Sequence, residues 1–190
     1  VKGAALHQLG CTWLGRDALT GAAVRPPALP GLAVDRWRTL TDEARGYGFH
    51  ATLKPPFFLA DGMTAASLFA AATAFARRRP PFNLPALRLA AISGFLALVP
   101  VERSSALHRL ADDGVSTLDG FRRPPSAGEL ARRRRASLTP RQDELLARWG
   151  YPYVFDEYRF HLTLTGRLGE AERAAVAELE DGDCRSLSRV

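Results

Sequence analysis

The sequence has little of what would place it in several common protein classes. Only two of its 190 residues are cysteines, Cys11 and Cys184, and no CxxC pair occurs, so neither a disulfide scaffold nor a zinc knuckle is expected. No run of 18 apolar residues occurs, because the alanine-rich stretch 64–76 is followed by three arginines, and this argues against a membrane partner. The first residues do not form a basic and then apolar signal segment, which favours the cytoplasm.

The composition is otherwise that of a globular chain, with 46% hydrophobic and 24% charged residues, which excludes wholesale disorder. Lysine and arginine together number 26 against 20 acidic residues, a formal net charge of +6. Such an excess favours an anionic partner, such as a phosphate ester, a nucleotide or RNA. A composition rich in alanine and arginine would produce the same excess without any such partner.

Apolar spacing and turn residues predict a mixture of helices and strands. Helices are expected at 6–14, 34–45, 64–79, 107–118, 139–150 and 170–180, and a hairpin at 87–101. Thr64 and Thr139 are the expected N-caps. Period-two alternation predicts two further strands, at 47–58 and 153–165.

Those last two segments match each other in sequence. The first reads Tyr-Gly-Phe-His-Ala-Thr-Leu-Lys over 47–54, and the second reads Tyr-Arg-Phe-His-Leu-Thr-Leu-Thr over 158–165. Alternation in a strand would bury the phenylalanines and leucines of each segment and project its histidine and threonine together from the other face. It would also place Lys54 beside His50 and Thr165 beside His161, whereas Tyr47 and Tyr158 would pack away from the histidines.

Two such faces carry the groups that phosphodiester cleavage requires. One histidine takes a proton from the attacking oxygen and the other gives one to the leaving oxygen, while Thr52 and Thr163 donate hydrogen bonds to the phosphate. Lys54 and Arg159 add positive charge for the same phosphate. Two histidines alone make a poor zinc site, so neither a metal nor another cofactor is expected, and His7 and His108 are expected to be surface residues.

Paired His-x-Thr motifs about a hundred residues apart resemble the 2H phosphoesterase superfamily, which includes 2′-5′ RNA ligase-like proteins and cyclic nucleotide phosphodiesterases. The fuller segments at 47–57 and 160–166, together with 13–17 and 148–153, resemble its DUF1045 branch, described as phosphonate metabolism proteins. The resemblance covers roughly residues 9–175.

The resemblance implies one bilobal α+β domain over 1–190, with two pseudo-symmetric β-α lobes, antiparallel sheets lining a central groove, and helices outside. The terminal strands usual in the family are expected to be missing. It implies that His50 and His161 are the catalytic pair of a metal-independent phosphodiesterase. The expected substrate is a small cyclic phosphate ester, such as a ribose cyclic phosphate.

Two alternatives remain open from the residues. One is an RNA ligase or RNA-end cyclic phosphodiesterase, in which the arginine run 132–135 holds the RNA backbone. The other is a phosphate-ligand binding module without catalysis.

Overall fold

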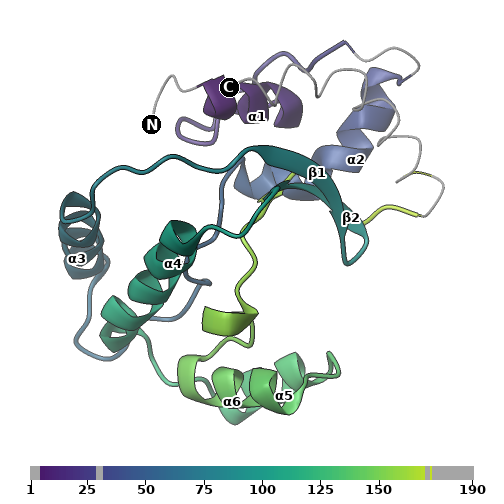
Figure 1. Cartoon of the computed structure of the whole chain (residues 1–190). Coiled ribbons are helices and arrows are strands. Elements are labelled where there is room, and N and C mark those ends of the chain that lie inside the picture. The colour runs from purple at the N-terminus through teal and green to yellow at the C-terminus, as the bar shows by residue number, and fades with distance from the viewer. Residues whose placement is uncertain (1–4, 29–31, 170–171, 173–190) are drawn as a thin grey trace. The chain divides into compact units, whose positions relative to one another are not determined.

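The computed structural model describes residues 5–28, 32–169 and 172 (Figure 1). These residues form a mixed α+β structure that divides into two compact units. Unit 1 combines segments 1–51, 85–103 and 161–190, and unit 2 combines 52–84 and 104–160. The chain therefore crosses between the units four times. None of the described helices has the length and apolar character needed to cross a bilayer.

Unit 1 contains two helices and a small antiparallel sheet. Helix α1 spans Ala5–Leu14 and helix α2 spans Val34–Tyr47. Strands β1 (Leu87–Ile92) and β2 (Phe95–Pro100) form the expected hairpin. Its turn residues Ser93 and Gly94 both have positive φ, at 46° and 99°, a conformation for which glycine has no steric penalty. Strand β3 (Leu162–Thr163) pairs antiparallel with β2, which gives the sheet the order β1-β2-β3.

The core of unit 1 holds its distant segments together. Leu40 of α2 and Leu96 of β2 pack with Leu168, and Trp13 and Leu89 lie against this cluster. The Trp13 indole donates to the Leu164 carbonyl at 2.9 Å, so helix α1 is tied to the end of β3.

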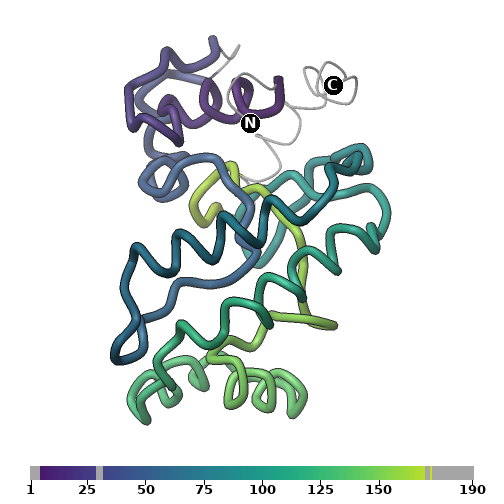
Figure 2. Tube along the Cα trace, turned by 90° about the vertical axis from the view of Figure 1, so that its left-hand side faces the viewer, coloured from purple at the N-terminus to yellow at the C-terminus, as the bar shows by residue number. Residues whose placement is uncertain are grey.

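Unit 2 is helical in the part of the chain that the structure describes. Its helices are α3 (Ala65–Arg77), α4 (Ser105–Thr117), α5 (Ala127–Arg134) and α6 (Pro140–Trp149), with 3₁₀ turns at Asp119–Phe121 and Phe155–Glu157. Thr64 and Thr139 cap α3 and α6 through the expected capping boxes. Helices α3 and α4 run side by side (Figure 2), with Phe75 of α3 packed close to Gly114 of α4. Val115, Leu145 and Val154 form a buried cluster.

Several predictions of the fold are wrong. The predicted strand 47–58 does not form: Tyr47 ends α2, residues 48–58 belong to no described strand, and one isolated bridge follows at Leu59. Of the predicted strand 153–165, only Leu162–Thr163 is a strand. Period-two burial shows only that alternate side chains face the core, and a segment without a hydrogen-bonded partner satisfies that condition equally well.

The two units do not repeat one β-α arrangement. The described sheet lies wholly in unit 1, so the expectation of an antiparallel sheet in each of two pseudo-symmetric lobes is wrong. Residues 170–180, where a helix was predicted, fall outside the described residues apart from 172.

Candidate functional site

The first histidine of the motif pair, His50, lies just beyond the end of α2. Gly48 ends the helix with φ at 78°, and its N–H donates to the Ala44 carbonyl. The His50 ring lies edge-on to Tyr47, with ring centroids 5.3 Å apart and an interplanar angle of 90°. His50 Nδ1 lies 3.0 Å from the Gly48 carbonyl. Because a carbonyl oxygen only accepts, Nδ1 is the donor in this bond, and Nε2 is the ring nitrogen left for a ligand.

The second histidine, His161, immediately precedes β3. Leu162 pairs with Leu98 and Thr163 with Ala97 across the sheet. Alternation buries Leu162 and Leu164, and leaves His161 and Thr163 half-buried. The His161 ring lies 5.9 Å from that of Phe95. The predicted sharing of one face by this histidine and its threonine is therefore confirmed for the second motif, although Thr165 is fully buried and does not share it.

Tyr47 links the two motif segments. Its side chain hydrogen-bonds to that of Thr163, while its ring contacts His50. Burial of the phenol and the nearby Glu43 carboxylate raise the pKa of Tyr47, and the Thr163 bond acts against them. The prediction that Tyr47 packs away from the histidines is thus wrong, because the helix continues through Tyr47 and no strand alternation applies there. Tyr47, His50, His161 and Thr163 are called the paired-histidine group below.

The other three predicted site residues belong to unit 2. Thr52 and Arg159 are exposed. The Lys54 side chain is only 8% exposed, and its ammonium donates to Asp119 at 3.1 Å and to the Val115 carbonyl at 3.0 Å. Burial lowers the pKa of Lys54, and Asp119 opposes that effect. The Lys54 ammonium is thus hydrogen-bonded to residues of unit 2.

A basic pocket of about 290 Å³ lies within unit 2. Its charged lining residues are Lys54, Arg122, Arg123, Glu129, Arg132 and Arg133, and its aromatic ones are Phe57, Phe58 and Trp149. The arginine run 132–135 thus ends helix α5 beside this pocket, with Arg133 stacked over Tyr151 at 5.0 Å. Sequence reasoning missed Tyr47 and this pocket. The adjacent Arg122 and Arg123 were the available signal for the pocket, but nothing near them in sequence indicated their aromatic neighbours.

Comparison with known proteins identifies relatives of most of the chain. Residues 52–188 match the family described as a protein of unknown function, DUF1045. A protein of Janthinobacterium sp. (strain Marseille), named ribose 1,5-bisphosphate phosphokinase PhnN, is 41% identical over 169 residues, which cover 89% of this chain and 37% of that protein. A protein of the same name from Laribacter hongkongensis (strain HLHK9) is 42% identical over 167 residues, which cover 87% of this chain and 38% of that protein. No solved structure matches the chain.

These relatives overturn the predicted reaction. Both are named as phosphokinases, and a kinase transfers a phosphoryl group to an acceptor, whereas the predicted enzyme would hydrolyse a diester. The prediction of a phosphodiesterase is therefore wrong. The error arose because paired histidines and hydroxyls suit several phosphate chemistries, and they do not specify which bond to phosphorus is made or broken.

Proposed function

The chain belongs to the DUF1045 family, and we propose that it supplies the ribose bisphosphate site of a ribose 1,5-bisphosphate phosphokinase. The observation that carries this proposal is the identity of 41% and 42% to two proteins of that name over nearly nine tenths of this chain. The chain spans less than two fifths of the length of those relatives. The activity of the whole relative thus extends to this chain only as a proposal.

The positions of the two lysines bear on which substrate this chain binds, the phosphorylated ribose or the nucleotide. A phosphate-binding loop of the Walker type requires Gly-Lys-Ser/Thr, with the lysine on the nucleotide phosphates. The chain has two lysines, and they follow Val1 and Leu53 rather than a glycine. We therefore assign to this chain the binding of the phosphorylated ribose and not that of the nucleotide.

The paired-histidine group has the chemistry to bind such a sugar. Catalysis of phosphoryl transfer consists mainly of positioning the acceptor and neutralising charge. His50 holds Nδ1 on the Gly48 carbonyl, which leaves Nε2 to donate to a phosphate oxygen when the ring is protonated. The Thr163 hydroxyl is a further donor, and Tyr47 holds it against the His50 segment. In this proposal His50, His161 and Thr163 contact the sugar phosphates.

The likeness to the 2H phosphoesterase superfamily is part of the same proposal. We propose that the two His-x-Thr segments are related to that superfamily in fold and in phosphate binding, within a bilobal domain. What supports this is the repetition of the motif together with the link that Tyr47 makes between its two copies within unit 1. An experimental structure that showed the two segments far from a common ligand would contradict it.

Calorimetric titration of the protein with ribose 1,5-bisphosphate tests the proposal. We expect saturable binding that His50→Ala and His161→Ala each weaken by about 10–100-fold, since a hydrogen bond to a charged group contributes roughly 1.5–3 kcal/mol. His108→Ala is the matched control, because His108 lies in unit 2 beside Tyr158, and it should leave affinity unchanged. Binding that resists both variants and is lost in Arg133→Ala would instead locate the sugar in the basic pocket.

A further inference from the structure

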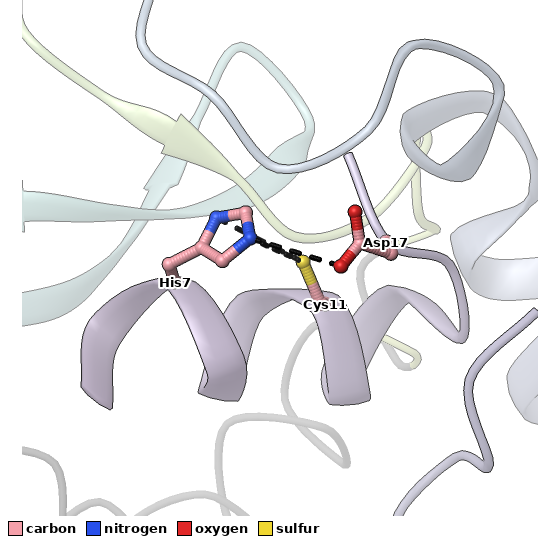
Figure 3. A group of neighbouring side chains, drawn as sticks. All are labelled: His7, Cys11 and Asp17. Carbon is pink, nitrogen blue, oxygen red and sulfur yellow. Dashed lines mark hydrogen bonds and ion pairs between the residues drawn. The ribbon is translucent and has the colours of Figure 1, made fainter. Parts of the chain in front are cut away.

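Three side chains with metal-ligating atoms converge in unit 1, apart from the paired-histidine group (Figure 3). His7 and Cys11 extend from α1, and Asp17 lies just after the helix. One ligand atom from each residue lies within 4.8 Å of the other two. The Cys11 sulfur is 3.5 Å from His7 Nε2, and that nitrogen is 4.0 Å from Asp17 Oδ2.

These separations are close to those of a zinc site. With Zn–S about 2.3 Å and Zn–N about 2.0 Å, a tetrahedral ion holds sulfur and nitrogen about 3.5 Å apart. The observed sulfur–nitrogen distance therefore needs no adjustment. Carboxylate and imidazole ligands of the same ion lie about 3.3 Å apart, so the Asp17 carboxylate would move toward His7 Nε2 from the observed 4.0 Å on binding the ion.

Local structure explains why the three residues meet. Positions four apart on a helix share one face, which places the His7 ring beside Cys11. Helix α1 ends at Leu14, and Gly15 turns the chain with φ at 67°. Asp17 Oδ1 then accepts the backbone N–H groups of Leu19 and Thr20, each at 2.8 Å. Those bonds fix the carboxylate so that Oδ2 is the oxygen nearest His7, an arrangement typical of ligating carboxylates.

The three side chains His7, Cys11 and Asp17 differ in burial. Cys11 is only 4% exposed, whereas the side chains of His7 and Asp17 keep 18% and 27% of their surface. Gly10, next to Cys11, lies so close to the Phe49 ring that a β-carbon there would fall 2.1 Å from its atoms. Helix α1 is thus packed at Gly10 against the segment that leads to His50.

We propose that His7, Cys11 and Asp17 bind a divalent transition metal ion, zinc by preference. A thiolate and an imidazole favour zinc over magnesium or calcium, which prefer oxygen ligands. On binding, the cysteine thiol loses its proton to solvent, and the thiolate and carboxylate together balance the two charges of the ion. Three protein ligands leave a fourth position for water or a ligand oxygen. This site is independent of the proposed sugar site.

Titration of the metal-free protein with zinc chloride, in competition with a chromophoric chelator, tests the proposal. One equivalent should bind, and Cys11→Ser and His7→Gln should each weaken binding by at least about 100-fold, more than is lost when an outer-shell partner is removed. Asp17→Asn is the conservative variant, because an amide oxygen can still accept the Leu19 and Thr20 N–H groups. It should weaken zinc binding while the unfolding temperature of the metal-free protein stays unchanged.

Controls separate this site from adventitious binding. His108→Gln removes a histidine of unit 2 outside the group and should leave affinity unchanged. The cobalt form of the wild type should show the thiolate-to-metal charge-transfer band in the near ultraviolet, and Cys11→Ser should abolish it. Absence of that band, or zinc binding that survives all three ligand variants, would overturn the proposal.

Discussion

The two motif segments have nearly the same sequence, but they differ in backbone, in burial and in the partners of equivalent residues. His161 and Thr163 flank or belong to a hydrogen-bonded strand, whereas His50 follows a helix end and a glycine with positive φ. Tyr47 is half-exposed and bonded to Thr163, while its counterpart Tyr158 is buried, with no hydrogen-bond partner for its hydroxyl among the described residues. The repeated pattern therefore keeps Phe49 and Phe160 buried, but it requires neither the same secondary structure nor the same burial of the tyrosines.

The last position of each segment shows the same contrast in a buried polar group. Lys54 is held by the Asp119 carboxylate and the Val115 carbonyl in unit 2. The hydroxyl of Thr165 instead accepts the Leu96 N–H at 3.0 Å and donates to the Gly166 carbonyl at 2.8 Å in unit 1. Each of these two side chains thus makes its hydrogen bonds within one unit. Substituting each residue separately measures how much those hydrogen bonds stabilise the fold.

The largest effect is expected from Asp119→Ala. The variant leaves the Lys54 ammonium buried without its counter-charge and also removes the ion pair of Asp119 with Arg122. We expect a loss of about 3 kcal/mol in the free energy of unfolding, the lower end for breaking a buried ion pair. Urea denaturation measures this loss. Lys54→Met in the same background should recover part of it, and failure to do so would show that the charge is not what destabilises the variant.

The Asp119 carboxylate also predicts that the stability of the protein falls at acid pH. Although burial acts to raise the pKa of Asp119, its bonds and charge interactions with Arg122 and Lys54 bring it below the usual 3.8. The stabilisation from Asp119 is therefore fully present above that value and is lost as the pH falls through the lowered pKa. Unfolding followed between pH 5 and pH 2 should show a shallower acid slope in Asp119→Asn than in the wild type, and equal slopes would contradict this role.

A smaller effect is expected at the equivalent position of the second segment. Thr165→Val keeps the side-chain shape but leaves the buried Leu96 N–H without its acceptor, at a cost of about 1–2 kcal/mol. Chemical denaturation gives this value. Thr165→Ser retains the hydroxyl and is the matched control, so an equal loss in both variants would assign the effect to packing.

Tyr47→Phe should affect the ligand more than the fold. The phenylalanine ring keeps the edge contact with His50 but loses the bond to Thr163, and one neutral hydrogen bond contributes about 1 kcal/mol. We expect ribose 1,5-bisphosphate to bind about 3–10-fold more weakly, and the free energy of unfolding to fall by at most about 1 kcal/mol. A calorimetric titration of the variant with unchanged affinity would show that Tyr47 does not position Thr163.

The smallest effect, and one of opposite sign, is expected from Tyr158→Phe. Burial, and then the charge of Asp112, raise the pKa of Tyr158 to about 12, and its buried hydroxyl has no hydrogen-bond partner in the described part of the chain. Removing an unsatisfied buried hydroxyl is neutral or stabilising, here by up to about 1 kcal/mol. A clear loss in thermal unfolding would mean that the hydroxyl makes a contact which the structure does not show.

The sequence was informative where local chemistry decides the structure. The capping boxes begun by Thr64 and Thr139, and the hairpin around Ser93 and Gly94, follow from neighbouring residues alone. The β-sheet pairing of the motif segments does not follow from neighbouring residues, because it depends on which distant strand is available. Only the second segment reaches β2.

The candidate site was predictable in residue type more than in geometry. The paired motifs identified His50, His161 and Thr163, but the linking role of Tyr47 depends on where α2 ends. His7 and Cys11 are four positions apart, and that spacing is typical of one face of a helix. Asp17 joins them only through the turn at Gly15. The proposed reaction rests on the relatives, because imidazoles and hydroxyls serve several phosphate chemistries.

A crystal structure of the protein with bound ribose 1,5-bisphosphate tests the central claim most directly. The account predicts a phosphate oxygen within hydrogen-bonding distance of His50 Nε2 and of the Thr163 hydroxyl, with Tyr47 still bonded to that threonine. A sugar bound only among Arg123, Arg132 and Arg133, with the paired-histidine group untouched, would contradict it.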